Sequence, residues 1–234
     1  MIAKDVYKTV SSRLQDLQEP RRWPWDAPSG DADPSLQVFL NNALLNIALH
    51  RPDSTAKSEI KTLVQGHMQT LGSDDLSLLE CVRYMDEDEK PIRAVTRIER
   101  SEMDAYLVDW YSENGENDGI WNWAYDRMTN PFIYWVYPGA KEDAKLETVV
   151  SKRPIKVEGL NSELEISELF KSALDAWVLF EVMASDTSDA NWNKASQYLQ
   201  TFGQILGVKM EIDMSFPVRV RNSEGAKMLM GASQ

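Results

Sequence analysis

The side chains that most often carry out chemistry are scarce in this sequence. Its only histidines are His50 and His67, and its only cysteine is Cys81. Zinc sites and Cys-His or Ser-His-Asp catalytic sets need several such groups held together, and no second histidine or cysteine stands at ligand spacing from either histidine. No glycine-rich phosphate-binding loop is present either. The sequence therefore predicts no catalytic residue, no cofactor and no metal ion, and these three side chains are interpreted as structural.

Carboxylates are abundant, and two arrangements of them could support chemistry. The run Asp86-Glu87-Asp88-Glu89 could attract a divalent cation, but it lacks the spaced ligands and the glycine of a calcium loop. A pair such as Asp86 and Asp126 could serve a hydrolase, which requires carboxyl groups held roughly 5–9.5 Å apart in a cleft. Nothing in the sequence places them so. The acidic run is best interpreted as a solvent-exposed hairpin turn.

The overall composition is that of a folded, acidic protein. Hydrophobic residues make up 43% of the chain, eight tryptophans are present, and the formal net charge is −12. Affinity for nucleic acid rests on cations that neutralise phosphates, so a DNA-binding protein is disfavoured. No run of about 18 apolar residues and no signal-peptide core are found, so we expect neither a membrane span nor export. A single cysteine excludes an internal disulfide and favours a reducing compartment.

Helical periodicity is found towards both ends of the chain. Apolar residues three or four positions apart predict a first helix over residues 6–19 and a second over 34–50. Ser162 and Glu165 form a capping box that would start a third helix. A fourth helix follows a polar turn and would end at Gly207.

The middle of the chain has a different pattern. From about residue 60, short apolar runs of β-forming residues predict strands. The best hairpin joins residues 121–125 to 132–137, and alternation would place Trp121, Trp123 and Tyr125 on one face. Aromatic residues of this hairpin could form an interface between protein subunits or, alternatively, a sugar- or receptor-binding surface. The candidates are Trp121, Trp123, Tyr134 and Trp135.

The predicted fold class is α+β. The two pairs of helices need partners, and the simplest solution packs them into one four-helix bundle formed by residues 1–59 and 158–207. Residues 60–157 would then be a β-rich insertion. Residues 208–234 would be an extended C-terminal arm, because hydrophobic residues alternate there and mildly basic ones accompany them. The residues concerned are Met210, Ile212, Met214, Phe216, Val218, Arg219, Val220, Arg221, Met228 and Leu229.

Several short segments, in order, resemble a known family. They include Arg22-Trp23-Pro24, Phe39-Leu40-Asn41-Asn42-Ala43, Arg51-Pro52-Asp53-Ser54, Leu78-Leu79-Glu80-Cys81-Val82 and Val136-Tyr137-Pro138. Each is only a packing or turn signature, but their order and spacing over residues 5–207 resemble the head-to-tail adaptor, or connector, proteins of short-tailed bacteriophages. The loop over residues 25–33 departs from that pattern, because the family tends to pass directly into the second helix.

The resemblance implies a structural protein of the virion neck and no enzyme. It implies a homo-oligomeric ring, a dodecamer, between the portal protein and the tail nozzle protein, made in the host cytoplasm and without a membrane partner. The helices would face the portal and the β-rich lobe the nozzle, where Trp121, Trp123, Tyr134 and Trp135 could contact the nozzle or a neighbouring subunit. The alternative is a tail-associated binding protein that uses these aromatic residues for a sugar or a receptor. Residues 208–234 would reach the portal. Genomic DNA would pass through a central channel without sequence-specific binding.

An acidic channel would suit such a ring. A polyanion slides more freely past carboxylates than past cations, because no counterions are released on contact. The hypothesis is that two acidic stretches face the channel. The candidate residues are Asp86, Glu87, Asp88, Glu89, Glu163, Glu165 and Glu168.

Overall fold

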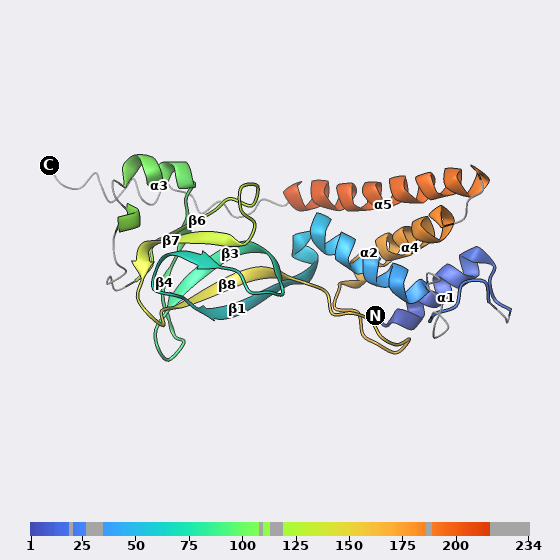
Figure 1. Ribbon diagram of the computed structural model, residues 1–234, viewed down its shortest axis with the longest axis horizontal. Helices are drawn as coiled ribbons and strands as arrows, with labels where there is room; N and C mark the ends of the chain where they lie inside the picture. Colours follow the sequence, from blue (N-terminus) through green and yellow to red (C-terminus); the bar gives the residue numbers. More distant parts are fainter. Residues whose placement is uncertain (19–20, 27–34, 108–109, 113–118, 186–188, 216–234) are drawn as a thin grey trace.

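The computed structural model describes residues 1–18, 21–26, 35–107, 110–112, 119–185 and 189–215, with the backbone alone over 189–190 and 208–215. Within these residues the protein has five α-helices and two four-stranded sheets. Four helices lie at one end of the long axis, and the sheets with the short helix α3 lie at the other (Figure 1). The molecule is therefore elongated, with a helical lobe and a β lobe.

The N-terminal segment is held by a distant part of the chain. Helix α1 spans Ala3–Leu14 and buries Val6 and Val10 against the helical core. Its first amide groups are satisfied across the chain, because Ala3 N donates to the Ser162 carbonyl at 3.0 Å. The helix ends at Gln15, which adopts a left-handed conformation. The predicted extension to residue 19 is therefore wrong.

Helix α4 is the centre of the helical lobe. It spans Lys171–Ala184, and every extensive helix–helix contact among the described residues involves it: α1, α2 (Leu36–His50) and α5 (Asp189–Ser215) each pack on α4. Leu174 and Leu179 are fully buried in this core. Trp177 of α4 meets Phe202 of α5 with ring centroids 4.8 Å apart.

The predicted four-helix bundle is wrong. A bundle requires each helix to pack against two neighbours around a common axis, whereas α1, α2 and α5 meet extensively only through α4. The fold is a mixed α+β structure of five helices and two sheets among the described residues, with α3 packed in the β lobe. Stripe patterns show which face of a helix is buried, but not which helix covers it.

The predicted ends of the last two helices are also wrong. Ser162 does not cap a helix: its hydroxyl accepts from Gly159 N at 3.2 Å, and the neighbouring Glu163 forms a β-bridge with Ile2. Helix α4 begins only at Lys171, after the 3-10 turn Glu168–Phe170. Helix α5 continues through Gly207 to Ser215, so an extended arm does not begin at residue 208. Residues 216–234 lie outside the described residues.

Two sheets share the core of the β lobe. One has the order β1-β8-β3-β4 and the other β2-β7-β6-β5. Their strands are β1 Ala56–Thr62, β2 Gly66–Thr70, β3 Asp75–Met85, β4 Pro91–Ala94, β5 Thr96–Arg97, β6 Asn122–Tyr125, β7 Ile133–Ala140 and β8 Lys145–Lys152. The core between the sheets includes Cys81, Trp123, Val136 and Leu146. The predicted aromatic hairpin is confirmed, since β6 and β7 pair antiparallel.

A short helix covers the outer face of the second sheet. Helix α3 spans Arg100–Tyr106 and is followed by the 3-10 turn Trp110–Ser112. Met103 and Trp110 pack with Ala124 of β6, with Trp135 and Tyr137 beside them. Both faces of the β6–β7 hairpin are therefore partly covered.

Asparagine and glutamine side chains of α2 hold the chain where it returns from the β lobe. Asn41 Oδ1 accepts from Val157 N at 2.8 Å, and its amide nitrogen donates back to the Val157 carbonyl at 3.2 Å. Gln37 adds a hydrogen bond to the same carbonyl. Two residues of one helix thus satisfy the backbone of a segment more than a hundred positions away.

Asp175 carries a carboxylate into the α1–α4 contact. It is 2% exposed, and its Oδ2 lies 3.4 Å from Lys171 Nζ. Burial raises the pKa of this carboxyl group, and the opposing charges of Lys171 and Arg13 do not fully offset the effect. The charged form is therefore destabilising in the folded protein.

Replacing Asp175 by asparagine should raise the free energy of unfolding at pH 7 by about 1 kcal/mol, because an ion buried at a cost is removed. A raised folded-state pKa means that the wild-type carboxyl group takes up a proton in the folded protein first as the pH falls, so the gain should vanish in acid. Urea unfolding between pH 4 and 8 measures it. A gain that is the same at every pH would contradict the role of ionisation.

Candidate functional site

The histidines and the cysteine make packing contacts. His67 is buried, with a ring nitrogen 3.0 Å from the Val136 carbonyl and its ring edge-on to Trp110. Cys81 is fully buried, and burial raises the pKa of its thiol, so the thiolate nucleophile is disfavoured. His50 is exposed at the end of α2, 2.9 Å from the Asn46 carbonyl.

The two aspartates considered for acid–base chemistry are each engaged in their own turn. Asp86 Oδ1 accepts from Lys90 N at 2.7 Å. Asp126 accepts from Met128 N and from the backbone and hydroxyl of Thr129, and the Thr129 hydrogen bonds hold its pKa below the usual value. Within the described residues, no group of three His, Cys, Asp or Glu side chains is arranged to hold a metal ion.

The acidic run forms the exposed turn between β3 and β4. Glu89 N donates to the Asp86 carbonyl at 3.1 Å, which closes the turn. Lys145 Nζ lies 3.0 Å from Glu89 Oε1, so the turn is tied to the start of β8. A hollow of about 490 Å³ lies between this turn and the β7–β8 turn, with Asp143 on its lining. The turn predicted for residues 86–89 is confirmed.

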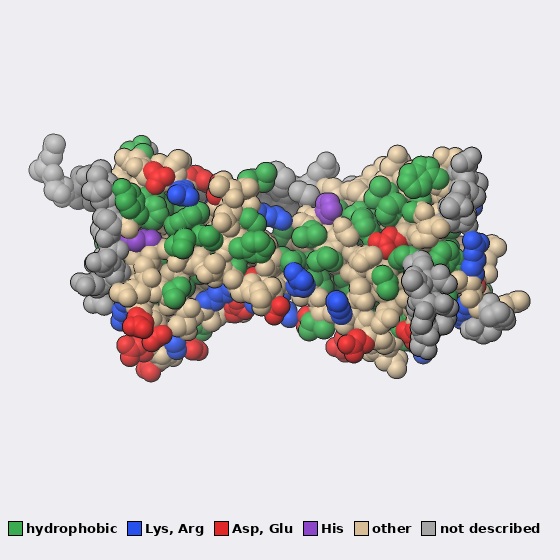
Figure 2. All heavy atoms as spheres, viewed as in Figure 1, with side chains coloured by type: hydrophobic (Ala, Val, Ile, Leu, Met, Phe, Trp, Pro, Cys, Tyr) green, Lys and Arg blue, Asp and Glu red, His purple; other side chains and the backbone are tan. Residues whose placement is uncertain are grey.

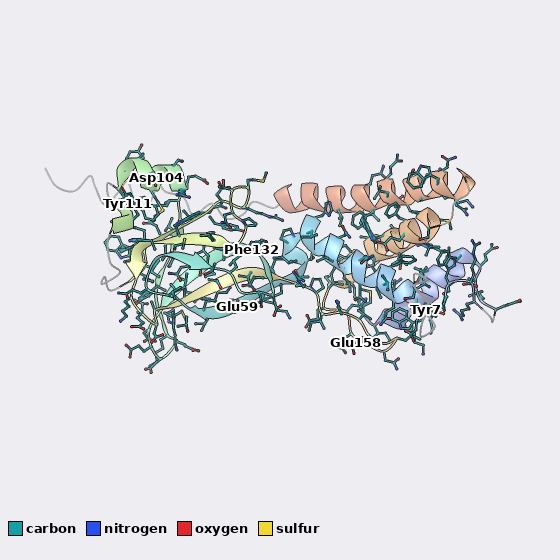
Figure 3. The ribbon with its side chains drawn as sticks, viewed as in Figure 1. Tyr7, Glu59, Asp104, Tyr111, Phe132 and Glu158 are labelled. Atoms are coloured by element: carbon teal, nitrogen blue, oxygen red, sulfur yellow. The ribbon has the colours of Figure 1, made fainter. Side chains whose placement is uncertain are left out.

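The second acidic group lies between β8 and α4. Glu163, Glu165 and Glu168 are exposed there. Glu165 pairs with Lys57 at 3.2 Å, and Glu168 lies 3.7 Å from the N-terminal amine. Figure 2 shows acidic side chains on the lower edge of both lobes, and Figure 3 labels Glu59 and Glu158 along it. The two predicted acidic groups are separate clusters that belong to different lobes.

The aromatic candidates do not form an exposed row. Trp123 and Tyr134 are 2% and 1% exposed and belong to the core between the sheets. Trp135 lies on the opposite face, packed near α3, with the Arg100 guanidinium 4.3 Å from its ring centroid. Trp121 alone of the four is half exposed, and Arg93 lies over its ring at 5.0 Å. The platform needed to stack a sugar is not assembled from these residues.

Of the residues predicted for portal contact, Met210, Ile212 and Met214 lie in the last turns of α5. Their side chains are outside the described residues, as are the seven predicted residues from Phe216 to Leu229. The alternation read as an extended segment is thus helical as far as Ser215.

Sequence patterns did not reveal a basic hollow beside α1. It has a volume of about 300 Å³ and is lined by Lys4, Tyr7, Lys8, Arg21 and Leu160 among others. The Arg21 guanidinium donates to the Tyr7 hydroxyl at 2.7 Å and lies 5.0 Å from its ring centroid. The available signal was weak, since residues 1–25 hold only five bases against three acids.

The described residues form a helical lobe and a β lobe, and none of the candidate residues among them is arranged as a metal site. In the described part of the chain, no helix is long and apolar enough to cross a membrane. Comparison with known families shows a match to the family described as SU10 adaptor protein over residues 1–221. A search of curated proteins found no match to the chain.

The matched region includes every described residue, so both lobes are part of one family fold. The chain is a phage adaptor protein, a class of structural components of the virion. It belongs to the SU10 adaptor protein family. The predicted resemblance to phage head-to-tail adaptors is thereby confirmed.

Proposed function

We propose that this protein forms a ring between the portal protein and the tail nozzle protein and lines the channel through which genomic DNA passes. The family match over residues 1–221 carries this proposal. The subunit number, twelve, follows the resemblance to short-tailed phage adaptors. An elongated chain with two lobes suits a subunit that contacts different partners at its two ends (Figure 1).

The distribution of charge supports a channel edge. The exposed acids of the β3–β4 turn and of the segment before α4 share one edge of the molecule in the view of Figure 2. Facing the axis, they would repel DNA phosphates and favour passage over binding. In this arrangement the proposed channel residues are Asp86 to Glu89, Glu163, Glu165 and Glu168.

Light scattering and electron microscopy of the purified chain, alone and mixed with the portal protein of the same virion, test the proposal. A ring that stacks on the portal is expected. Persistent monomer in both samples, without association, would overturn the ring. A ring that places residues 86–89 on its outer wall would overturn the channel assignment alone.

The C-terminal residues are proposed to contact the portal. Deleting residues 216–234 should abolish portal association, because hydrophobic residues of this segment would bury their surface only there. Helix α5 ends at Ser215, so the deletion removes no residue of a described element. Pull-down by the portal protein measures the loss, and circular dichroism should match the full chain.

A full-length variant tests whether the side chains of this segment, rather than its length, are needed for portal binding. Serine at Phe216, Val218 and Val220 keeps the charge and should also lose portal binding by at least about tenfold, whereas glutamine at Arg219 and Arg221 tests the cationic contribution. Normal binding by both the deletion and the serine variant would refute this role of the segment.

A further inference from the structure

Helix α2 has no charged side chain on any of its faces. Its 15 residues, Leu36–His50, include no Asp, Glu, Lys or Arg, in a chain of which 26% is charged. One face is buried in the helical core, with Leu40 and Ile47 at 1% and 0% exposure. The solvent-facing side of a surface helix usually carries charged residues, and the outward face of α2 has none.

That outward face bears a stripe of large hydrophobic side chains. Val38, Leu45 and Leu49 are 48%, 37% and 44% exposed. Their spacing of seven and four residues places them along one side of the helix. Scattered exposed leucines need no explanation, but an aligned set without charges marks an interaction surface. We name these three residues the α2 stripe.

The apolar surface continues from the α2 stripe onto the β lobe. Arg127 donates to the Leu49 carbonyl at 3.4 Å, which brings the β6–β7 turn to the end of α2. Met128 and Phe132 of this turn are 93% and 55% exposed. Figure 2 shows hydrophobic side chains across this junction and over α2, and Figure 3 places Phe132 between the lobes. The surface thus runs along the long axis of the molecule.

The other flank of α2 is also poor in charge. Asn42 donates to Glu181 of α4 at 3.1 Å, and the same carboxylate accepts from Trp177 at 2.7 Å, so this acid is already engaged. Beyond Trp177 lies α5, whose residues 191–207 contain one charged side chain, Lys194. A core without charged residues and a polar, uncharged rim are typical of protein interfaces.

We propose that the α2 stripe, with Met128 and Phe132, is a lateral interface that contacts a second copy of this chain. The inference rests on the proposed ring and names the surface that closes it. Two copies that each carry a net charge of −12 repel one another. They approach most readily through faces that are poor in acids: the α2 stripe contains none, and the nearby Asp126 and Glu181 are engaged in hydrogen bonds. Neighbouring subunits in a ring contact each other along their lengths, and this surface runs along the length of the molecule.

Charge placed in the stripe tests the interface. Glutamate at both Leu45 and Leu49 should reduce ring formation at least about tenfold, because two carboxylates would be desolvated on assembly. Both positions are exposed in the single chain, so thermal unfolding of the monomer should hardly change. Ile92→Glu is the control: it puts a carboxylate on a hydrophobic side chain that is 57% exposed in β4, outside the stripe. Its rings should form normally.

A cross-link identifies the occupant directly. Leu45→Cys can be labelled with a benzophenone maleimide, because the native Cys81 is fully buried. After illumination of rings in the presence of the portal protein, an adduct of two copies of the 26.7 kDa chain is expected.

The outcomes separate the two proposals. If the double glutamate variant forms rings as readily as the wild type does, the proposed interface is overturned, but the proposed ring is not. Normal rings together with a portal adduct at residue 45 overturn it in favour of a portal contact. Failure of wild type to form rings under any condition overturns the proposed function, and this inference with it.

Discussion

Replacing Trp123 by alanine is expected to lower the free energy of unfolding by about 3–5 kcal/mol, the usual cost of truncating a buried aromatic side chain. The ring is 2% exposed, stands opposite Val136 in the β6–β7 register and fills the core shared by the two sheets. Thermal unfolding should show a midpoint lower by roughly 6–20 °C. The variant should also expose hydrophobic surface on partial heating.

Trp121→Ala is the matched control two residues away. Its ring is 50% exposed and is contacted by the Arg93 guanidinium at 5.0 Å, an interaction whose loss costs about 1 kcal/mol or less. The two variants should therefore differ by at least about 2 kcal/mol. Equal destabilisation would contradict the assignment of Trp123, and not Trp121, to the core. A glycan affinity that is lost in the Trp121 variant would favour the sugar-binding alternative.

The aromatic hairpin shows what local patterns can and cannot reveal. Strand alternation correctly predicted the β6–β7 hairpin and grouped Trp121, Trp123 and Tyr125 on one face. Trp123 and Tyr125 are buried, whereas Trp121, which precedes β6, is half exposed. Exposure could not be predicted, because it depends on the first sheet behind the hairpin and on α3 in front of it. The first sheet and α3 are formed by other parts of the chain, so the pattern of residues 121–137 contains no information about them.

The helix boundaries follow the same rule. Helix α2 was predicted within two residues, because the turn at Arg51-Pro52 ends it locally. The capping box at Ser162 failed because residues 162–164 instead pair with the N-terminal residues, where Leu164 N donates to the Met1 carbonyl. Gly207 did not end α5, since a glycine within a helix costs only about 1 kcal/mol.

The candidate surfaces were predictable to different degrees. The acidic turn of residues 86–89 was evident from its composition, and it is exposed as expected. The α2 stripe was not predicted, because the helical spacing over residues 34–50 was interpreted only as the buried face of the helix. The available signal was the absence of any charged residue over Leu36–His50, which is unusual for a helix with a solvent-facing side.

A buried carboxylate organises one end of the first sheet. The Asp75 side chain is 1% exposed, forms ion pairs with Lys61 and, at 2.7 Å, with Lys152, and accepts from Gly72 N at 2.8 Å. Glu59 pairs with the same two lysines at 3.3 and 2.6 Å. Strands β1, β3 and β8 are thus joined by ion pairs between their side chains.

Asp75→Asn is expected to destabilise the protein by about 3 kcal/mol at pH 7. Removing one member of a buried ion pair costs about 3–5 kcal/mol, and the lower end applies because the lysines, 15% and 25% exposed, keep part of their hydration. Asp74→Asn, at the exposed neighbouring position, should change stability by less than about 0.5 kcal/mol. Urea unfolding of both variants measures the difference.

The pH dependence distinguishes this charge cluster from ordinary packing. Burial opposes ionisation of Asp75, but Lys152, Lys61 and the Gly72 amide outweigh it, so the pKa lies below its usual value. A lowered folded-state pKa stabilises the folded protein above the unfolded-state pKa, and the contribution is lost as the pH falls through the folded-state value. The gap between wild type and Asp75→Asn should therefore be full at pH 7 and shrink below about pH 4. For Asp175, protonation in acid removes the cost of a buried charge. Lowering the pH should therefore change the stability contributions of the two carboxyl groups in opposite directions. A gap for Asp75 that stays constant into acid would assign its effect to shape rather than charge.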